Sequence, residues 1–170
     1  MNFEIFQSQV LPTKNKLFRF TSRLLGNEED AKDVVQEVFV KVWNGGKLEH
    51  IQNWEAWCMR IAKNLSLDRL RVNQRRTMES FDGNSYSVHA NELSPHEKTE
   101  INQNMEQISN WMQALPDKQR QVLHLRDVEG YSYQEICEIM DVDMSQVKVN
   151  LFRARTTLRE KLIKMNEYGV

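Results

Sequence analysis

The sequence predicts an all-α protein made of two small helical domains joined by a flexible linker. Apolar residues recur at helical spacing in almost every patterned segment, and no segment has the alternation typical of a strand. Glycine and proline number only 6 and 3 among 170 residues, which disfavours a turn-rich β-sandwich. A polar stretch without apolar periodicity, Ser80 to Pro95, separates two groups of helical patterns. We therefore expect domains at residues 1–78 and 97–170 and a linker at 79–96, with a long surface loop in one domain as the alternative.

The first 25 residues predict two helices. The segment 3–10 is short and apolar on one side, and the segment 13–25 has a clear apolar face that ends at Gly26. The residues on one face of the second of these helices are Leu17, Phe20, Leu24 and Leu25.

The clearest pattern predicts a third helix, which runs from Glu28 to the glycine pair at 45–46. Asn27 can cap it, and three acidic residues in its first turn suit the positive end of the helix dipole. Its apolar stripe comprises Ala31, Val34, Val35, Val38, Phe39, Val42 and Trp43. A second stripe beside it comprises Asp33, Gln36, Glu37 and Val40. Carboxylates and an amide suit a basic partner surface better than DNA, although such acids are often simply solvated.

A fourth helix starts after Asn53 and carries strong positive charge. Six residues between Arg60 and Arg76 are basic and one is acidic. One side of the helix holds Arg60, Asn64, Asp68, Arg71 and Arg75, with Lys63, Arg69 and Arg76 near it. Residues expected in the core are Trp54, Cys58, Ile61, Leu65 and Val72. Cations interleaved with Trp54 and Trp57 suit single-stranded nucleic acid, although a tryptophan at helical spacing is more often a core residue.

After the linker we expect four helices. The first has an apolar stripe of Ile101, Met105, Ile108, Met112 and Leu115, and the second, which starts at Pro116-Asp117 and closes at Gly130, carries Val122, Leu123 and Val128. Ser132 and Glu135 form a capping box that starts a short helix with Ile136, Cys137 and Met140 inward. After a tight turn at 141–143, Asp143 caps the last helix, whose buried stripe is Val147, Leu151, Ala154, Leu158 and Leu162.

The short helix, the tight turn and the long last helix together predict a helix-turn-helix. This arrangement allows the second helix to enter a DNA major groove. The residues left on or near the outer side are Lys148, Val149, Asn150, Phe152, Arg153 and Arg155. Between Lys148 and Lys164 there are six basic residues and one acidic residue, so the positive charge gathers on the presumed reading helix. A solvated hairpin in an ordinary helical bundle is the alternative.

The composition excludes several classes of protein. The formal net charge is -1, from 23 Lys plus Arg and 24 Asp plus Glu, so a histone-like protein that coats DNA by itself is excluded. No apolar run exceeds four residues and the first residues lack a signal-peptide pattern, so we expect no membrane insertion and a cytoplasmic protein. Cys58 and Cys137 lie far apart without metal-ligand spacing, and we expect no metal and no cofactor.

Several of these segments resemble RNA polymerase sigma factors. Residues 24–43 (LLGNEEDAKDVVQEVFVKVW) and 57–71 (WCMRIAKNLSLDRLR) are similar to sigma region 2. Residues 131–136 (YSYQEI) and 151–155 (LFRAR), with the neighbouring Leu115-Pro116 and Val147-Lys148, are similar to region 4. Both regions in this order, joined by a short linker with nothing added, resemble the extracytoplasmic-function (group IV) sigma factors.

This resemblance implies a non-enzymatic factor that binds core RNA polymerase and promoter DNA. The residues implied to contact the β′ clamp helices are Asp33, Gln36, Glu37 and Val40. Those implied to open and read the −10 element are Lys47, His50, Arg60, Lys63, Asn64, Asp68, Arg71 and Arg75. Those implied to read the −35 element are Ser145, Gln146, Lys148, Val149, Asn150, Phe152, Arg153 and Arg155. Further implied partners are the β flap and an anti-sigma factor held between the domains.

The reading helix departs from the family pattern at two points. Its entrance is Ser145-Gln146-Val147, where the family commonly has Gly-Thr-Val. Val149 stands where a small residue is usual, and an apolar side chain there is suited to a thymine methyl group. The preferred −35 sequence therefore stays open.

Two other functions compete with the sigma factor. A free-standing helix-turn-helix regulator would bind DNA alone and would need an effector or dimerisation domain in residues 1–78. A helical metal-dependent hydrolase would use Glu28, Glu29, Asp33 and Glu37. A two-metal site needs carboxylates that converge from facing helices, whereas the facing helix here is basic with a single acid, Asp68.

Overall fold

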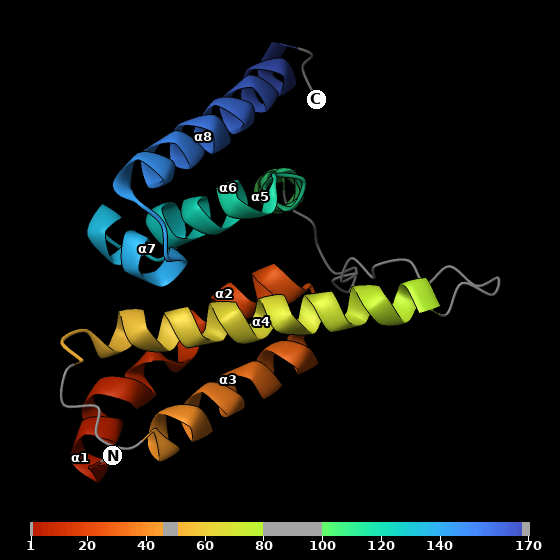
Figure 1. Cartoon of the computed structure of the whole chain (residues 1–170). Helices are drawn as coiled ribbons and strands as arrows, with labels where there is room; N and C mark the ends of the chain where they lie inside the picture. Colours follow the sequence, from red (N-terminus) through yellow and green to blue (C-terminus); the bar gives the residue numbers. More distant parts are fainter. Residues whose placement is uncertain (1, 46–50, 80–99, 168–170) are drawn as a thin grey trace. The chain divides into compact units, whose positions relative to one another are not determined.

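The computed structural model describes residues 2–45, 51–79 and 100–167, and its regular elements are all helices, with no β-strand in these ranges (Figure 1). The all-α prediction is confirmed. The helices before residue 80 build one compact unit, and those after residue 99 build the main part of a second. The predicted linker, residues 79–96, lies outside the described residues except for its first residue.

The first unit begins with three short helical turns and continues with three longer helices. The turns are α1 (Phe3–Ile5), the π-helical η1 (Phe6–Val10) and the 3-10 helical η2 (Leu11–Thr13). The longer helices are α2 (Lys14–Leu25), α3 (Glu28–Asn44) and α4 (Trp54–Glu79), which pack pairwise against one another.

Local caps explain where these helices begin and end, as the sequence predicts. Gly26 has a φ of 70°, in the left-handed region that suits glycine, and it ends α2. The Oδ1 atom of Asn27 accepts hydrogen bonds from the backbone N–H groups of Glu29 and Asp30 at 2.8 and 3.3 Å. The Oδ1 atom of Asn53 accepts one from the N–H of Ala56 at 2.9 Å at the start of α4. The two asparagine caps satisfy backbone donors that the first helical turn leaves without partners.

The core of the first unit follows the predicted stripes of α2 and most of α3. The buried residues of these helices are Leu17, Phe20, Thr21, Leu24, Ala31, Val34, Val35, Val38 and Val42. Trp43 belongs to the predicted apolar stripe, but its side chain is 43% exposed. Its ring packs edge-on against Phe6 with centroids 5.2 Å apart, and Phe6 packs in the same way against Phe39. Trp43 and Phe39 thus form an aromatic rim at the end of α3.

The buried side of α4 differs from the prediction. The buried residues are Ala56, Cys58, Met59, Ala62 and Ser66, together with Lys63. Of the residues expected in the core, only Cys58 is fully buried, Trp54, Ile61 and Leu65 are half-buried, and Val72 is 44% exposed. Apolar side chains are spread around α4, so their spacing defines no single stripe. α4 packs against α2 and α3, and two of its fully buried side chains, Ala62 and Ser66, are small.

The described residues after position 99 form four α-helices and one π-helical turn. These elements are α5 (Glu100–Gln113), α6 (Asp117–Leu123), η3 (His124–Val128), α7 (Tyr133–Met140) and α8 (Met144–Glu167). α8 packs against α6 and α5, and the core includes Val122, Leu125, Ile136, Val147, Leu151 and Ala154.

Two residues of the predicted apolar patterns are exposed. Val128 is 49% exposed at the end of the π-helical turn η3, whereas Leu125 in the same turn is buried. Met105 is 64% exposed, although Met112 and Leu115 of the same predicted stripe are buried and Ile108 is half-buried. Gly130, with a φ of 80°, ends this part of the chain as expected.

Candidate nucleic-acid interface

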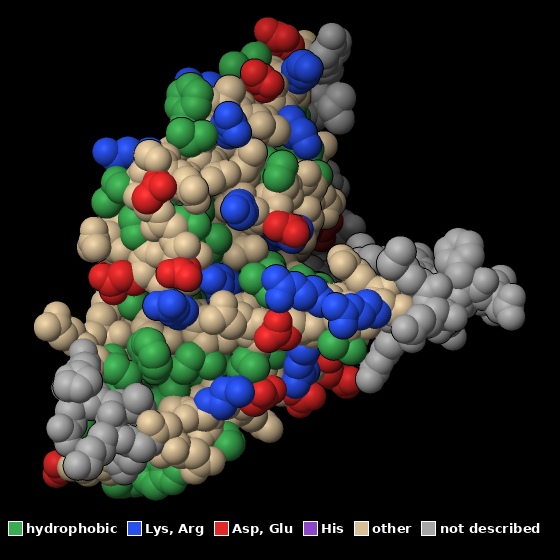
Figure 2. Space-filling model, in the orientation of Figure 1, with side chains coloured by type: hydrophobic (Ala, Val, Ile, Leu, Met, Phe, Trp, Pro, Cys, Tyr) green, Lys and Arg blue, Asp and Glu red, His purple; other side chains and the backbone are tan. Residues whose placement is uncertain are grey.

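Positive charge lines one side of α4. Asn64, Asp68, Arg71 and Arg75 are exposed there, and Arg60, on the same side, is half-buried. The Nη1 atom of Arg71 donates to Oδ1 of Asp68 at 3.1 Å, so the single acid of this side holds one of its cations in place. Figure 2 shows Lys and Arg side chains gathered along this helix. Exposed guanidinium groups at helical spacing can contact successive phosphates of a nucleic acid.

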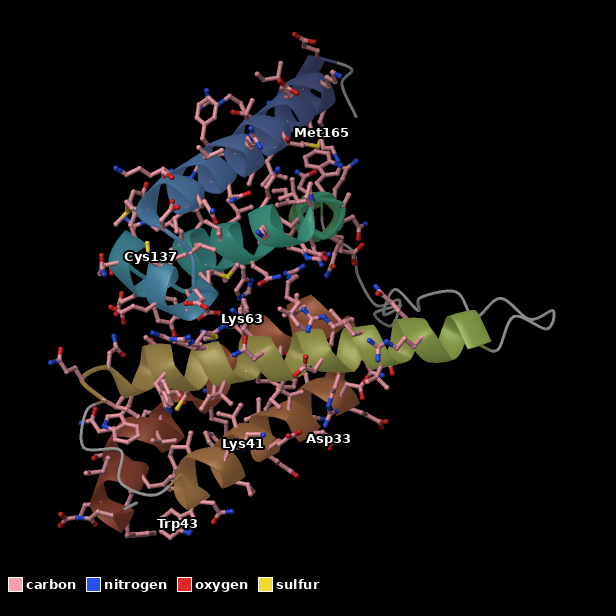
Figure 3. All side chains as sticks on the ribbon, in the orientation of Figure 1. Asp33, Lys41, Trp43, Lys63, Cys137 and Met165 are labelled. Atoms are coloured by element: carbon pink, nitrogen blue, oxygen red, sulfur yellow. The ribbon has the colours of Figure 1, made fainter. Side chains whose placement is uncertain are left out.

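The acidic stripe of α3 lies beside α4 and is partly neutralised by it. Arg69 of α4 brings Nη1 to 3.4 Å from Oδ1 of Asp30 and 3.6 Å from Oδ2 of Asp33, and Nη2 to 3.8 Å from Oε2 of Glu37. Lys41 lies 3.8 Å from Oε1 of Glu37. Asp33 and Lys41 stand about two turns apart on α3 (Figure 3). Oxygens of Asp33 nevertheless remain open to a partner, because that side chain is 65% exposed.

The remaining members of this stripe also reach solvent. Gln36 is exposed and Val40 is 57% exposed, while Glu37 is 40% exposed. An amide, two carboxylates and one apolar side chain therefore share a solvent-facing strip of α3. Such a strip offers hydrogen-bond acceptors to a basic protein surface and is unsuited to phosphates.

Sequence reasoning placed Arg69 near the basic side of α4, and this is wrong. Arg69 follows Arg60 by nine positions, which amounts to about half a turn beyond two full turns at about 100° per residue. Helical periodicity therefore predicts that Arg69 lies on another side of α4 than Arg60. The sequence does not predict its three acidic partners, because they depend on how α3 packs against α4.

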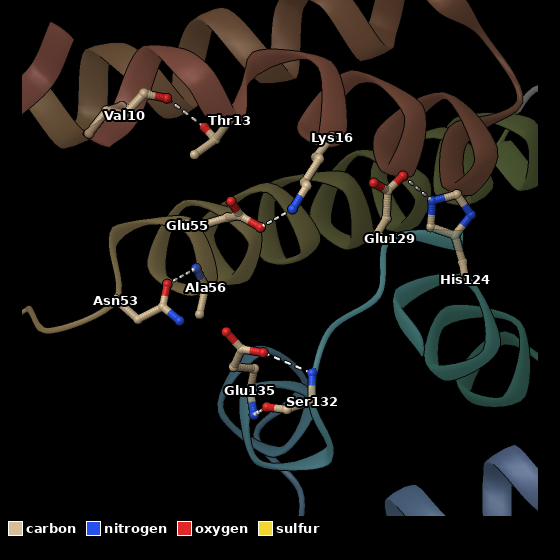
Figure 4. A network of polar contacts seen from close by, with 10 residues as sticks. All are labelled: Val10, Thr13, Lys16, Asn53, Glu55, Ala56, His124, Glu129, Ser132 and Glu135. Atoms are coloured by element: carbon tan, nitrogen blue, oxygen red, sulfur yellow. Dashed lines mark hydrogen bonds and ion pairs between the residues drawn. The ribbon is translucent and has the colours of Figure 1, made fainter. Parts of the chain in front are cut away.

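A short turn between two capped helices forms the helix-turn-helix of the second unit. Glu135 accepts a hydrogen bond from the N–H of Ser132 at 2.8 Å, and the Ser132 hydroxyl accepts one from the N–H of Glu135 at 3.2 Å (Figure 4). This capping box is the one that the sequence predicts. Asp141 adopts the left-handed conformation, with a φ of 57°, and lets the chain turn toward α8.

Asp143 fixes the start of α8. Its Oδ1 atom accepts hydrogen bonds from the Ser145 hydroxyl at 2.5 Å and from the N–H of Gln146 at 2.8 Å. These two bonds lower the pKa of the Asp143 carboxyl below its ordinary value, and the bond from the Ser145 hydroxyl contributes most. The predicted N-cap is confirmed.

The outer side of α8 carries the predicted reading residues. Those that are exposed are Ser145, Gln146, Lys148, Val149, Phe152 and Arg153. Asn150 is half-buried, and its Nδ2 atom donates to the carbonyl of Gln146 at 2.8 Å. This side combines cations for phosphates with polar and apolar groups for base edges.

Arg155 is held by a partner within the second unit. Its Nε atom donates to Oδ2 of Asp127 at 3.0 Å, and its Nη2 atom donates to Oδ1 at 2.5 Å. This bidentate interaction with Asp127 raises the pKa of the Arg155 guanidinium above its ordinary value. Arg155 therefore joins α8 to η3, which speaks against the predicted DNA contact, although that contact stays a prediction.

Three predicted site residues need separate mention. Lys63 lies on α4 (Figure 3), and it is one of the buried residues of that helix. Lys47 and His50 lie outside the described residues.

The described residues contain no group of three or more His, Cys, Asp or Glu side chains placed to hold a metal ion. The Arg69 guanidinium lies among Asp30, Asp33 and Glu37, where a hydrolase would need a metal ion. Cys58 is fully buried, which raises the pKa of its thiol to about 12 and keeps it protonated. Of the helices in the described ranges, none has the length and apolarity needed to cross a bilayer.

Comparison with known proteins agrees with this arrangement. The family described as sigma-70 region 2 matches residues 10–76, and the one described as sigma-70, region 4 matches residues 105–158. An ECF RNA polymerase sigma-E factor of Haemophilus influenzae is 31% identical over 167 residues, covering 92% of this chain and 87% of that protein. SigW of Bacillus subtilis is 29% identical over 157 residues, covering 88% of this chain and 84% of that protein. SigE of Mycolicibacterium smegmatis is 31% identical, and the chain spans 58% of its length.

Two solved structures share the fold. The sigma factor RpoE of Bartonella quintana, solved with the anti-sigma factor NepR, has a TM-score of 0.76 at 23% identity and covers 94% of this chain and 97% of its own. CnrH, solved with the cytosolic domain of CnrY, has a TM-score of 0.64 at 20% identity and covers 96% of this chain and 90% of its own.

A region 2 helical unit followed by a region 4 helix-turn-helix defines a sigma-type transcription initiation factor. Within that class, the chain belongs to the extracytoplasmic-function (ECF) RNA polymerase sigma factors. It directs transcription initiation by RNA polymerase at promoters, and its family consists of initiation factors that are not themselves catalysts.

Proposed function

We propose that the first domain, residues 1–78, docks on the β′ clamp helices and holds melted −10 DNA. The observation that carries this proposal is the opposite charge of two neighbouring helices, α3 and α4, within one unit. The polymerase-binding residues are Asp33, Gln36, Glu37 and Val40. The −10 residues are Lys47, His50, Arg60, Lys63, Asn64, Asp68, Arg71 and Arg75. The carboxylates suit a basic protein surface, while the guanidinium groups suit phosphates.

The second domain, residues 97–170, would grip the −35 duplex and contact the β flap. The side of α8 opposite its buried stripe would enter the major groove, with the turn at Asp143 setting its angle. The proposed contacts are Ser145, Gln146, Lys148, Val149, Asn150, Phe152 and Arg153. We give Arg155 a structural part instead, because Asp127 engages two of its nitrogen atoms.

The chain itself would catalyse no reaction and would act in the cytoplasm, where core RNA polymerase works. The chain would contribute binding energy and would position the polymerase on the promoter, since the polymerase itself makes the RNA. RpoE and CnrH were solved with NepR and with the cytosolic domain of CnrY, respectively. By analogy we include an anti-sigma factor among the partners of this chain.

A pair of substitutions on α3 tests the docking surface. Replacing Gln36 and Glu37 with alanine should weaken binding to core RNA polymerase roughly tenfold, about 1.4 kcal/mol, because an amide and a carboxylate are lost from the proposed contact. Fluorescence anisotropy of the labelled full chain titrated with core polymerase measures this. The matched control replaces the exposed Glu4 and Gln7, which are the same residue types on the same unit.

Equal affinity of the two double variants would contradict the docking surface. The rival function has its own test, because a free-standing regulator binds its operator without polymerase. Tight, sequence-specific binding of a duplex by the isolated chain would favour that rival. The sigma factor proposal expects specific binding only by the holoenzyme, because the net charge of the chain is -1.

A further inference from the structure

Two large apolar side chains are exposed in the middle of the outer side of α8. Val149 is 45% exposed and Phe152 is 71% exposed. At about 100° per residue, they lie roughly 200° and 140° around the helix from the buried Val147. They therefore stand opposite the buried stripe, which also includes Leu151 and Ala154. Their i, i+3 spacing makes them neighbours on the helix surface.

Cations flank this apolar pair on both sides. Lys148 lies roughly 100° around the helix from Val147, and Arg153 lies roughly 240° around it, and both are exposed. The pair is thus the centre of a strip with positive edges. A strip of this kind complements the floor and the two phosphate walls of a DNA major groove, because the cations reach the walls and the centre meets the base edges.

The apolar centre has one matching group in that groove. Every base pair offers hydrogen-bond donors and acceptors there, but the C5-methyl group of thymine is the apolar feature of the major-groove edge. A valine side chain has no donor or acceptor with which to read any other base. Burying a guanine or cytosine edge against it would leave polar groups without partners, at a cost in free energy.

We propose that Val149, supported by Phe152 beside it, selects thymine in the −35 element through its C5-methyl group. This inference rests on the proposed function of α8 as the −35 reading helix. It adds a specificity determinant and names the chemical group that it recognises. Docking of another protein on the same apolar pair is the competing use, and the experiment below separates the two.

Deoxyuridine tests this proposal because it lacks only the methyl group of thymine. Holoenzyme assembled from the full chain and core RNA polymerase first selects duplexes from a library randomised across the −35 region. Each thymine of the selected element is then replaced singly by deoxyuridine, and the affinity of the holoenzyme for each duplex is measured. At one position the substitution should weaken binding about fourfold, which corresponds to about 0.8 kcal/mol for one buried methyl group.

Two variants of the chain assign this loss to Val149. Val149→Ser should bind the thymine and deoxyuridine duplexes equally at that position. Val128→Ser changes the same residue type at an exposed site on η3, 49% exposed, and should keep the fourfold difference. Both positions are exposed, so neither change removes a core contact, and circular dichroism of each variant checks that the fold is kept.

The outcomes distinguish the two levels of the argument. If the holoenzyme selects no −35 sequence at all, the proposed function of α8 and this inference both fail. If it selects a sequence but no deoxyuridine position depends on Val149, the inference alone is overturned. Loss of core binding in Val149→Ser, with the thymine preference unchanged, would identify the pair as a protein-docking site and would also overturn it.

Discussion

Arg153 and Arg155 lie two positions apart on α8, but their side chains have different surroundings. Arg153 is exposed on the outer side, whereas Arg155 donates two hydrogen bonds to Asp127. Replacing either with alanine removes one positive charge from the same helix. The pair of variants therefore has matched long-range electrostatics, and differences between them report on local contacts.

The structure sets the expected magnitudes. The Arg155 and Asp127 side chains are 47% and 37% exposed, so solvent screens their attraction, and Arg155→Ala should cost about 1 kcal/mol of the free energy of unfolding of the second unit. Arg153→Ala should change that free energy by less than about 0.5 kcal/mol. In promoter binding the order reverses. Arg153→Ala should weaken holoenzyme binding to a −35 duplex about tenfold, and Arg155→Ala less than about twofold.

Two measurements on the full chain check these values. Hydrogen exchange of the α8 amides under native conditions follows the stability of the second unit, and duplex titration of the holoenzyme follows affinity. A double-mutant cycle between Arg155→Ala and Asp127→Ala should give a coupling of about 0.5–1 kcal/mol. The reasoning is refuted if Arg155→Ala leaves α8 exchange unchanged and lowers promoter affinity as much as Arg153→Ala does.

Two further predictions concern the first unit. Arg69→Gln should lower the free energy of unfolding by about 1 kcal/mol, since three acidic side chains of α3 surround Arg69. Arg71→Gln should lower it by less than about 0.5 kcal/mol, because the Arg71–Asp68 pair is exposed. Urea denaturation measures both, and equal urea midpoints of the two variants would contradict this prediction. Burial raises the pKa of Cys58 to about 12, so its contribution to stability is complete below pH 9.0 and is lost as the pH rises toward 12. The stability advantage over Cys58→Ala should shrink by up to about 1.4 kcal/mol per pH unit above 9, and a constant difference would disprove the assignment.

Several features of the fold follow from neighbouring residues alone. Asn27, the Ser132 capping box and Asp143 were predicted to start helices, and each makes the expected hydrogen bonds. Gly26 and Gly130 adopt the positive φ angles expected where helices stop. Such signals act within four residues, so tertiary packing is not needed to interpret them.

Predictions that depended on a strong apolar stripe succeeded in part. The buried sides of α3 and of the first half of α8 match the periodicity, since each has one dominant apolar face. The buried side of α4 does not match, because its apolar residues are spread around the helix. Val128, which the sequence includes among the apolar residues of its helix, is exposed at the end of the π-helical turn η3.

The sequence by itself determined the all-α class, most helix ends, the helix-turn-helix and the residues of its outer side. These depend on short-range hydrogen bonds and on helical periodicity, which any stretch of chain carries with it. Only the tertiary structure decided which charges pair between helices. Arg69 forms ion pairs with acidic side chains of α3, and Arg155 binds Asp127, which lies 28 positions earlier in the sequence. A charged side chain has many candidate partners along the chain, and the packing of helices selects among them.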